Sequence, residues 1–186
     1  MRFQNEVSSS IVLSLRFGGV VQYLGITGES NYRMKLNAKM SEMLEGANIP
    51  KAFSGLLSMD TSMPLSFTVV DGCVLLKDEY EKAKHVRLES FQDRTGFECF
   101  VNHRHFPYSG TRESLLSCLK HAVTLQRALA HEANDRRFLV ILSVGDGCTV
   151  RFHEVRPGEN WAAENLEGYA GEAVLLLPVG GTEDTK

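Results

Sequence analysis

Four pairs of apolar, strand-like segments are each joined by a short turn, and this hairpin pattern constrains the fold more than any other feature of the chain. The clearest turn is Asp71-Gly72, because this dipeptide suits the two positive φ angles of a type I′ hairpin. The predicted pairs are residues 10–15 with 20–24, 65–70 with 73–76, 86–92 with 97–105, and 138–144 with 148–155. A last strand is expected at residues 173–178. Strands that arrive as hairpins favour an antiparallel sheet.

Helical periodicity accompanies these hairpins. Thr111 can cap a long helix over residues 112–132, whose broad apolar face belongs against a sheet. Gln126 lies on that face, where its amide either bonds the backbone of an adjacent strand or lies at the floor of a pocket. A second helix is predicted at residues 31–45. Shorter helical segments are expected after Pro50, at residues 79–84 behind a capping box of Asp78 and Glu81, and at residues 159–167.

The chain is an α+β protein by these signals, with a mainly antiparallel sheet, one long helix packed on it and a small Met-rich helical segment. Its 186 residues fit one domain over residues 1–179, in which residues 31–64 form a helical insertion or subdomain. Residues 180–186 read as a flexible tail.

Charge and cysteine usage narrow the class of protein. The net charge is −3 and there is no run of Lys and Arg, so the sequence does not favour nucleic acid as a partner. The four cysteines are single and far apart, as is typical of free thiols. No signal-peptide core is present, and no apolar stretch approaches the ~20 residues of a membrane helix. A cytoplasmic location without membrane contact is therefore expected.

Five metal-capable residues gather between Cys99 and His121, and their spacing tests whether they form one site. On a strand, Cys99 and His103 would lie about 13 Å apart, whereas His103 and His105 would share a face about 7 Å apart. A zinc site would then use His103, His105 and a third ligand from the following helix, His121 or Cys118. The simpler interpretation is a solvated strand end, with no cofactor.

A nucleophilic site is the other catalytic alternative. Cys99 could be activated by His103 or His85, since a thiol needs a neighbouring base. No Gly-x-Ser-x-Gly elbow and no phosphate-binding glycine loop occurs. The acidic residues of the β-rich regions are interpreted as solvated, namely Glu79, Glu89, Glu98 and Glu154.

Two segments have the composition of binding surfaces. Methionines off the helical stripe or in loops could adapt to a partner, namely Met34, Met59 and Met63. The second segment combines hot-spot residue types with an acidic helix that could meet a basic partner. Its candidate residues are Arg151, His153, Arg156, Glu159, Trp161, Glu164, Glu167 and Tyr169.

The sequence therefore favours a non-catalytic protein that binds a protein partner, of the inhibitor, toxin-immunity or adaptor type. The alternative is a small hydrolase-like enzyme that uses Cys99 and His103, or a zinc ion on the histidines.

Overall fold

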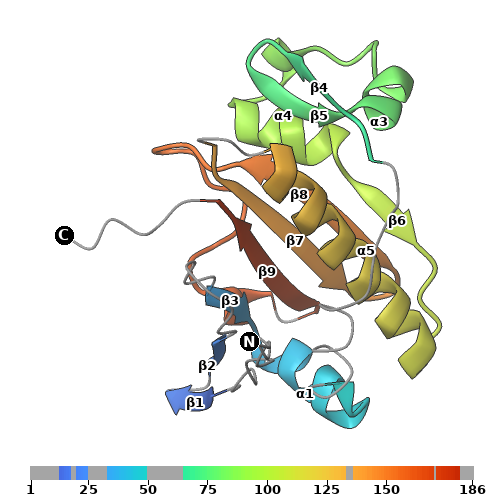
Figure 1. Cartoon of the computed structure of the whole chain (residues 1–186), viewed down its shortest axis with the longest axis vertical. Helices are drawn as coiled ribbons and strands as arrows, with labels where there is room; N and C mark the ends of the chain where they lie inside the picture. Colours follow the sequence, from blue (N-terminus) through green and yellow to red (C-terminus); the bar gives the residue numbers. More distant parts are fainter. Residues whose placement is uncertain are drawn as a thin grey trace, which may run out of the picture.

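The structure is a computed structural model of the chain, and it describes residues 13–17, 20–24, 33–49, 65–132, 136–169 and 171–180. The helix expected after Pro50 and the tail expected beyond Gly180 lie outside the described residues, as do Met59 and Met63. The predicted fold class is confirmed: the chain is α+β, with a mostly antiparallel sheet and one long helix (Figure 1).

The main sheet has seven strands in the order β1-β2-β3-β9-β7-β8-β6, and every neighbouring pair is antiparallel. Phe17 of β1 pairs with Val20 of β2, which confirms the hairpin expected between residues 10–15 and 20–24. The hairpin β7–β8 and the last strand are also confirmed. The strands are β1 (Leu13–Phe17), β2 (Val20–Leu24), β3 (Arg33–Leu36), β6 (Arg104–Phe106), β7 (Phe138–Val144), β8 (Cys148–Glu154) and β9 (Ala173–Val179).

A separate two-stranded sheet contains β4 (Phe67–Val70) and β5 (Cys73–Leu76). Its turn residues Asp71 and Gly72 have φ angles of 51° and 80°, as the type I′ prediction requires. This small sheet packs with α3 (Lys77–Lys82) and α4 (Arg94–Val101) around its own apolar cluster, which includes Phe97 and Val101. Figure 1 shows this unit at the top of the molecule.

The long helix α5 (Arg112–Glu132) confirms the prediction made from its apolar face. The hydroxyl of Thr111 accepts a 3.3 Å hydrogen bond from the Ser114 N–H at its start. The helix crosses one face of β7, β8 and β9, and α1 (Ala38–Gly46) packs on β9 (Figure 1). Gln126 donates its amide N–H to the Pro178 carbonyl at 3.0 Å. Of the two alternatives for this side chain, the structure therefore has the bond to the backbone of an adjacent strand.

The opposite face of the main sheet is covered by the irregular segment between β8 and β9. Leu166 packs there against Ile141, Val174 and Leu176. The helix expected at residues 159–167 is wrong: only a short 3-10 turn, η2 (Leu166–Gly168), forms. The turn at Pro157-Gly158 brings Arg156 and Glu159 into a β-bridge, which is incompatible with a helix starting at residue 159.

The helix expected from residue 31 is also partly wrong. The predicted helical insertion at residues 31–64 instead contains strand β3, because Leu36 pairs with Leu175 of β9. Asn37 then ends the strand and starts α1, since its side-chain oxygen accepts hydrogen bonds of 3.0 Å from the N–H groups of Met40 and Val174. Pairing with β9 therefore overrides the local helical pattern.

The hairpin expected at residues 86–105 does not form. Residues 88–90 are a 3-10 turn, η1 (Leu88–Ser90), and residues 94–101 are helix α4; only β6 at residues 104–106 is a strand. Asp93 caps α4 by accepting a 2.7 Å hydrogen bond from the Gly96 N–H. Helix α3 begins at residue 77 with no side-chain cap, so the capping box expected of Asp78 and Glu81 is absent there.

Candidate functional site

Two buried polar side chains, Glu98 in α4 and Asn102 at the C-cap of that helix, connect the small sheet to the main sheet. The carboxylate of Glu98 accepts 2.8 Å hydrogen bonds from the N–H groups of Val74 in β5 and Glu154 in β8. The side chain of Asn102 accepts from the Leu76 N–H at 2.8 Å and donates to the carbonyls of Val74 at 2.9 Å and Phe152 at 3.3 Å. These bonds fix the position of α4 beside β8.

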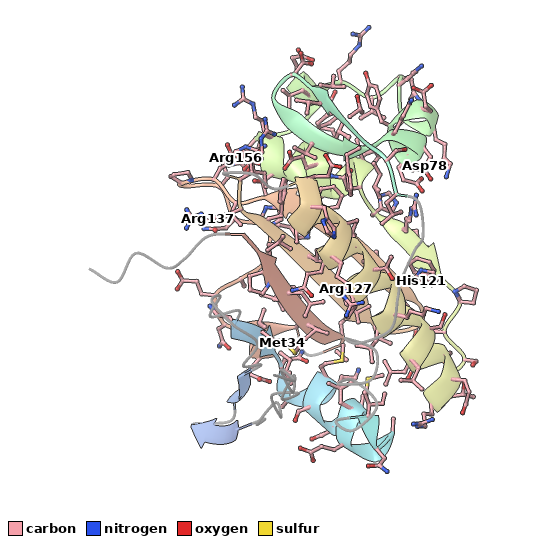
Figure 2. The ribbon with its side chains drawn as sticks, viewed as in Figure 1. Met34, Asp78, His121, Arg127, Arg137 and Arg156 are labelled. Atoms are coloured by element: carbon pink, nitrogen blue, oxygen red, sulfur yellow. The ribbon has the colours of Figure 1, made fainter. Side chains whose placement is uncertain are left out.

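Arg156 also binds the Glu98 carboxylate that connects the two sheets. Its guanidinium donates to both carboxylate oxygens of Glu98 at 2.8 Å and to the Glu154 carboxylate at 3.0 Å. Burial lowers the pKa of Arg156, but the hydrogen bond and charge of Glu98 outweigh it and raise the pKa overall. The interpretation of Glu98 as solvated is wrong, since its side chain is fully buried. Arg156 likewise has a structural role beside α4 (Figure 2).

A line of ring contacts runs along the surface that α4 and β6 form. Phe91 lies 5.3 Å from Phe100, Phe100 lies 5.7 Å from His103, and His103 lies 4.9 Å from His105, measured between ring centroids. The His103 Nδ1 contacts the Phe100 carbonyl, which only accepts, so this nitrogen donates. The predicted proximity of His103 and His105 is thus present in the structure.

The line continues onto β8. His105 forms a 3.1 Å hydrogen bond with the hydroxyl of Thr149, and Arg151 lies two residues further along the same face of that strand. The guanidinium carbon of Arg151 lies 5.5 Å from the ring centroid of Trp161. We call this set the aromatic–histidine surface; it consists of Phe91, Phe100, His103, His105, Arg151 and Trp161.

The three histidines of the zinc alternative do not converge. His121 stacks on Phe106 with ring centroids 4.0 Å apart. Phe106 and His105 are consecutive residues of β6, so their side chains point to opposite faces of the sheet. His121 therefore lies on the α5 side (Figure 2), away from His103 and His105. In the part of the chain that the structure describes, no three His, Cys, Asp or Glu side chains are grouped to hold a metal ion.

Cys99 lacks the environment of a nucleophile. It lies in α4 rather than in a strand, and its side chain is fully buried. Burial raises the pKa of the Cys99 thiol far above its usual range, although the charge of Arg151 lowers it in part. The thiol is therefore protonated at neutral pH. No hydrogen bond joins Cys99 to His103 among the described contacts.

Several residues of the segment predicted to bind a partner form hydrogen bonds within the fold instead. Glu159 accepts from the Thr95 N–H at 3.0 Å, Glu167 accepts from the Ala38 N–H at 2.9 Å, and the hydroxyl of Tyr169 accepts from the Ala163 N–H at 3.0 Å. Burial raises the pKa of Glu159, but the Thr95 bond and the positive charge of Arg156 lower it overall. Glu164 is exposed.

Two further candidates are buried to different extents. His153 is 3% exposed, and its Nδ1 forms a 2.9 Å hydrogen bond with the Glu154 carbonyl. Met34 is half-buried and packs against the main core. Of the predicted residues, Arg151 and Trp161 therefore have the geometry of a binding surface.

A small cavity lies on the other side of β6. Its volume is about 20 Å³, room for a water molecule and little more. Arg104 lines it and is held by ion pairs to Asp78 and to Glu79, the latter at 2.8 Å. Burial, Arg104 and Lys120 lower the pKa of His121. The lining residues are Leu65, Leu76, Asn102, Arg104, Phe106, His121, Thr124, Leu125 and Val150.

Sequence reasoning missed Phe91, Phe100, Glu98 and Asn102. The signal that could have found them is the Asp93-x-x-Gly96 cap, which starts a helix and places Glu98 and Asn102 at i and i+4.

The residues 35–182 match the model of the uncharacterized protein PM0498 family, so the chain belongs to that family. No curated protein and no solved structure matches the chain. None of the described helices is long and apolar enough to cross a membrane.

Proposed function

We propose that this protein is a non-catalytic binding protein of the inhibitor, immunity or adaptor type, and that a protein partner binds at the aromatic–histidine surface. The observation that carries the proposal is the exposure of two of its large rings, one on α4 and one in the segment that follows β8. Phe100 is 44% exposed and Trp161 is 43% exposed. Exposed Trp and Arg side chains are the types that dominate binding energy at protein interfaces.

The order of the surface supports this role. Four of its rings form a contiguous line, the last of them bonds to Thr149, and the ring of Trp161 lies against Arg151, so their positions are set before a partner arrives. A preorganised surface loses less entropy on binding than one whose side chains are mobile. The small unit at the top of the fold positions Phe91 and Phe100, and Glu98 and Asn102 fix that unit on β8.

The hydrolase-like alternative has weaker support. It requires a reactive Cys99 or three convergent histidines, whereas Cys99 is buried and protonated and His121 lies on the far face of the sheet. The cytoplasmic location stays part of the proposal and is supported by four cysteines that are all free thiols.

The experiment is a binding measurement with matched surface variants. Purified protein serves as bait in an extract of its native cell, and the affinity for the recovered partner is then measured by calorimetry. Trp161→Ala and Phe100→Ala should each weaken binding by about tenfold or more. Val69→Ala is the control, because Val69 is 58% exposed on β4 outside the surface.

The control should bind like the original protein. Equal affinity of the original protein and both surface variants would contradict the proposal. Far-ultraviolet circular dichroism of every variant shows whether a loss of binding reflects a loss of folding.

A further inference from the structure

Arg151 differs from other arginines near it: among the residues that the structure describes, its side chain has a ring partner and no carboxylate partner. Arg104 pairs with Glu79 at 2.8 Å, and Arg156 pairs with Glu98 at 2.8 Å. Arg151 lies over the ring of Trp161, and no ion pair to it occurs among the described residues. A stacked guanidinium keeps its N–H edge available for a bidentate carboxylate.

Two carboxylates near this surface already bond within the fold, whereas Glu164, in the segment that carries Trp161, is exposed. Glu98 is saturated by Arg156 and two backbone N–H groups. Glu159, in the segment that carries Trp161, accepts from the Thr95 N–H and lies near the charge of Arg156. The surface therefore presents one cation, two imidazoles and exposed apolar rings.

We infer that the partner contacts this surface with an acidic segment, in which a carboxylate binds Arg151 and neighbouring apolar side chains pack on Trp161 and Phe100. This inference rests on the proposed function and names the chemistry of the partner. The sequence instead predicted a basic partner, on the basis of an acidic helix at residues 159–167. That helix does not form, and two of its three carboxylates, Glu159 and Glu167, bond within the fold.

The test compares two labelled peptides by fluorescence anisotropy with the full chain. In one peptide, glutamates alternate with phenylalanine and serine; in the other, lysines replace all the glutamates. The acidic peptide should bind more tightly than the lysine peptide, and added NaCl should weaken its binding. Arg151→Gln should weaken the acidic peptide by about tenfold, and Arg151→Lys should weaken it less, because lysine keeps the charge but not the bidentate geometry.

The matched control is Lys120→Gln, which removes an exposed positive charge from α5 on the opposite face of the sheet. It should leave the affinity unchanged. Glu164→Gln, which removes the exposed carboxylate of the segment, should leave the affinity equal or slightly higher.

Equal binding of the two peptides, no binding of the acidic one, or an Arg151→Gln variant that binds as well as the original protein would overturn the inference. In that case the proposed function is judged separately, by whether the native partner still depends on Trp161 and Phe100. If the recovered native partner binds Trp161→Ala and Phe100→Ala as tightly as the original protein, the proposed function fails whatever the peptides show.

Discussion

Arg156 donates two 2.8 Å hydrogen bonds to the two carboxylate oxygens of Glu98, and this carboxylate is fully buried between two sheets. The residues are 58 positions apart, so the pair forms only when β8 and α4 are both in place. A buried carboxylate is tolerated when it is paired and its remaining lone pairs are satisfied. The N–H groups of Val74 and Glu154 satisfy them.

Glu98→Gln should lower the free energy of unfolding by about 3 kcal/mol. The change removes the buried counter-charge of Arg156, which then keeps only Glu154, and it puts an N–H donor where a carboxylate oxygen accepts from a backbone N–H. Urea unfolding followed by circular dichroism measures this change. Glu81→Gln is the control, since Glu81 pairs with the exposed Lys84 at 2.5 Å and should leave the unfolding midpoint almost unchanged. A Glu98→Gln midpoint equal to that of the control would refute a structural role for the pair.

Asn102→Ala should cost about 3 kcal/mol, because it leaves the Leu76 N–H and the carbonyls of Val74 and Phe152 buried without partners. Hydrogen exchange gives a local readout: the Leu76 amide should lose its protection. Asn160→Ala changes an exposed amide and serves as the control. Unchanged exchange at Leu76 would show that Asn102 does not hold β5 in place.

His153 should make stability depend on pH. Burial lowers its pKa, although the bond to the Glu154 carbonyl raises it in part, so the folded value lies below the unfolded value of about 6.5. The unfolded chain therefore takes up the proton first as the pH falls, and stability is lost as the pH drops through about 6.5. The Nε2 atom of His153 is buried with no hydrogen-bond partner among the described residues, so a proton there adds a buried charge.

The unfolding free energy should consequently fall less steeply in His153→Gln than in the original protein between about pH 7.5 and pH 5.5. His121, whose pKa is also lowered, acts in the same direction and leaves part of the slope. Asn160→Ala, which removes an exposed side chain that does not titrate, should keep the original slope. Identical slopes for His153→Gln and the original protein would rule out this titration.

Two glycine substitutions should change the free energy of unfolding in opposite directions. Gly72 has a φ of 80°, and a Cβ there would meet only the Arg94 side chain at 3.6 Å, so Gly72→Ala should cost about 1–2 kcal/mol through backbone strain alone. Gly46 is in α1 with open space around its Cβ position, so Gly46→Ala should stabilise the protein by about 0.5–1 kcal/mol. Thermal unfolding measures both; a shift in the same direction for the two variants would contradict the assignment.

The hairpins and the long helix could be predicted because their signals are local. Asp71-Gly72 adopts the positive φ angles that it favours, and α5 has one apolar face against one sheet. Helix α4 could not be predicted in this way. Phe97 and Val101 face the small core, Cys99 is buried outside that cluster, and Glu98 bridges to β8. A helix buried on several sides shows no single stripe, and its alternating apolar residues imitate a strand.

The candidate site was predictable to the same extent. His103 and His105 lie close together, as their spacing indicates. Phe100 could not be predicted as part of the site, because the sequence pattern indicates a strand where residues 94–101 form helix α4. The contact between Arg151 and Trp161 joins a strand to an irregular segment, and no local pattern encodes such a contact. The prediction of an acidic helix at residues 159–167 is wrong because the Arg156–Glu159 bridge bends the chain where the helix would begin.

The side chains of Glu98 and Asn102 also protect the chain from unwanted association. Strands β5 and β8 each have backbone N–H and C=O groups that point away from their hairpin partners, and such open strand edges are templates for pairing with another molecule. Here Val74, Leu76, Phe152 and Glu154 bond to α4 side chains instead. Two residues of one helix thus take the place of a strand, and a chain that lost them would expose two sites for aggregation.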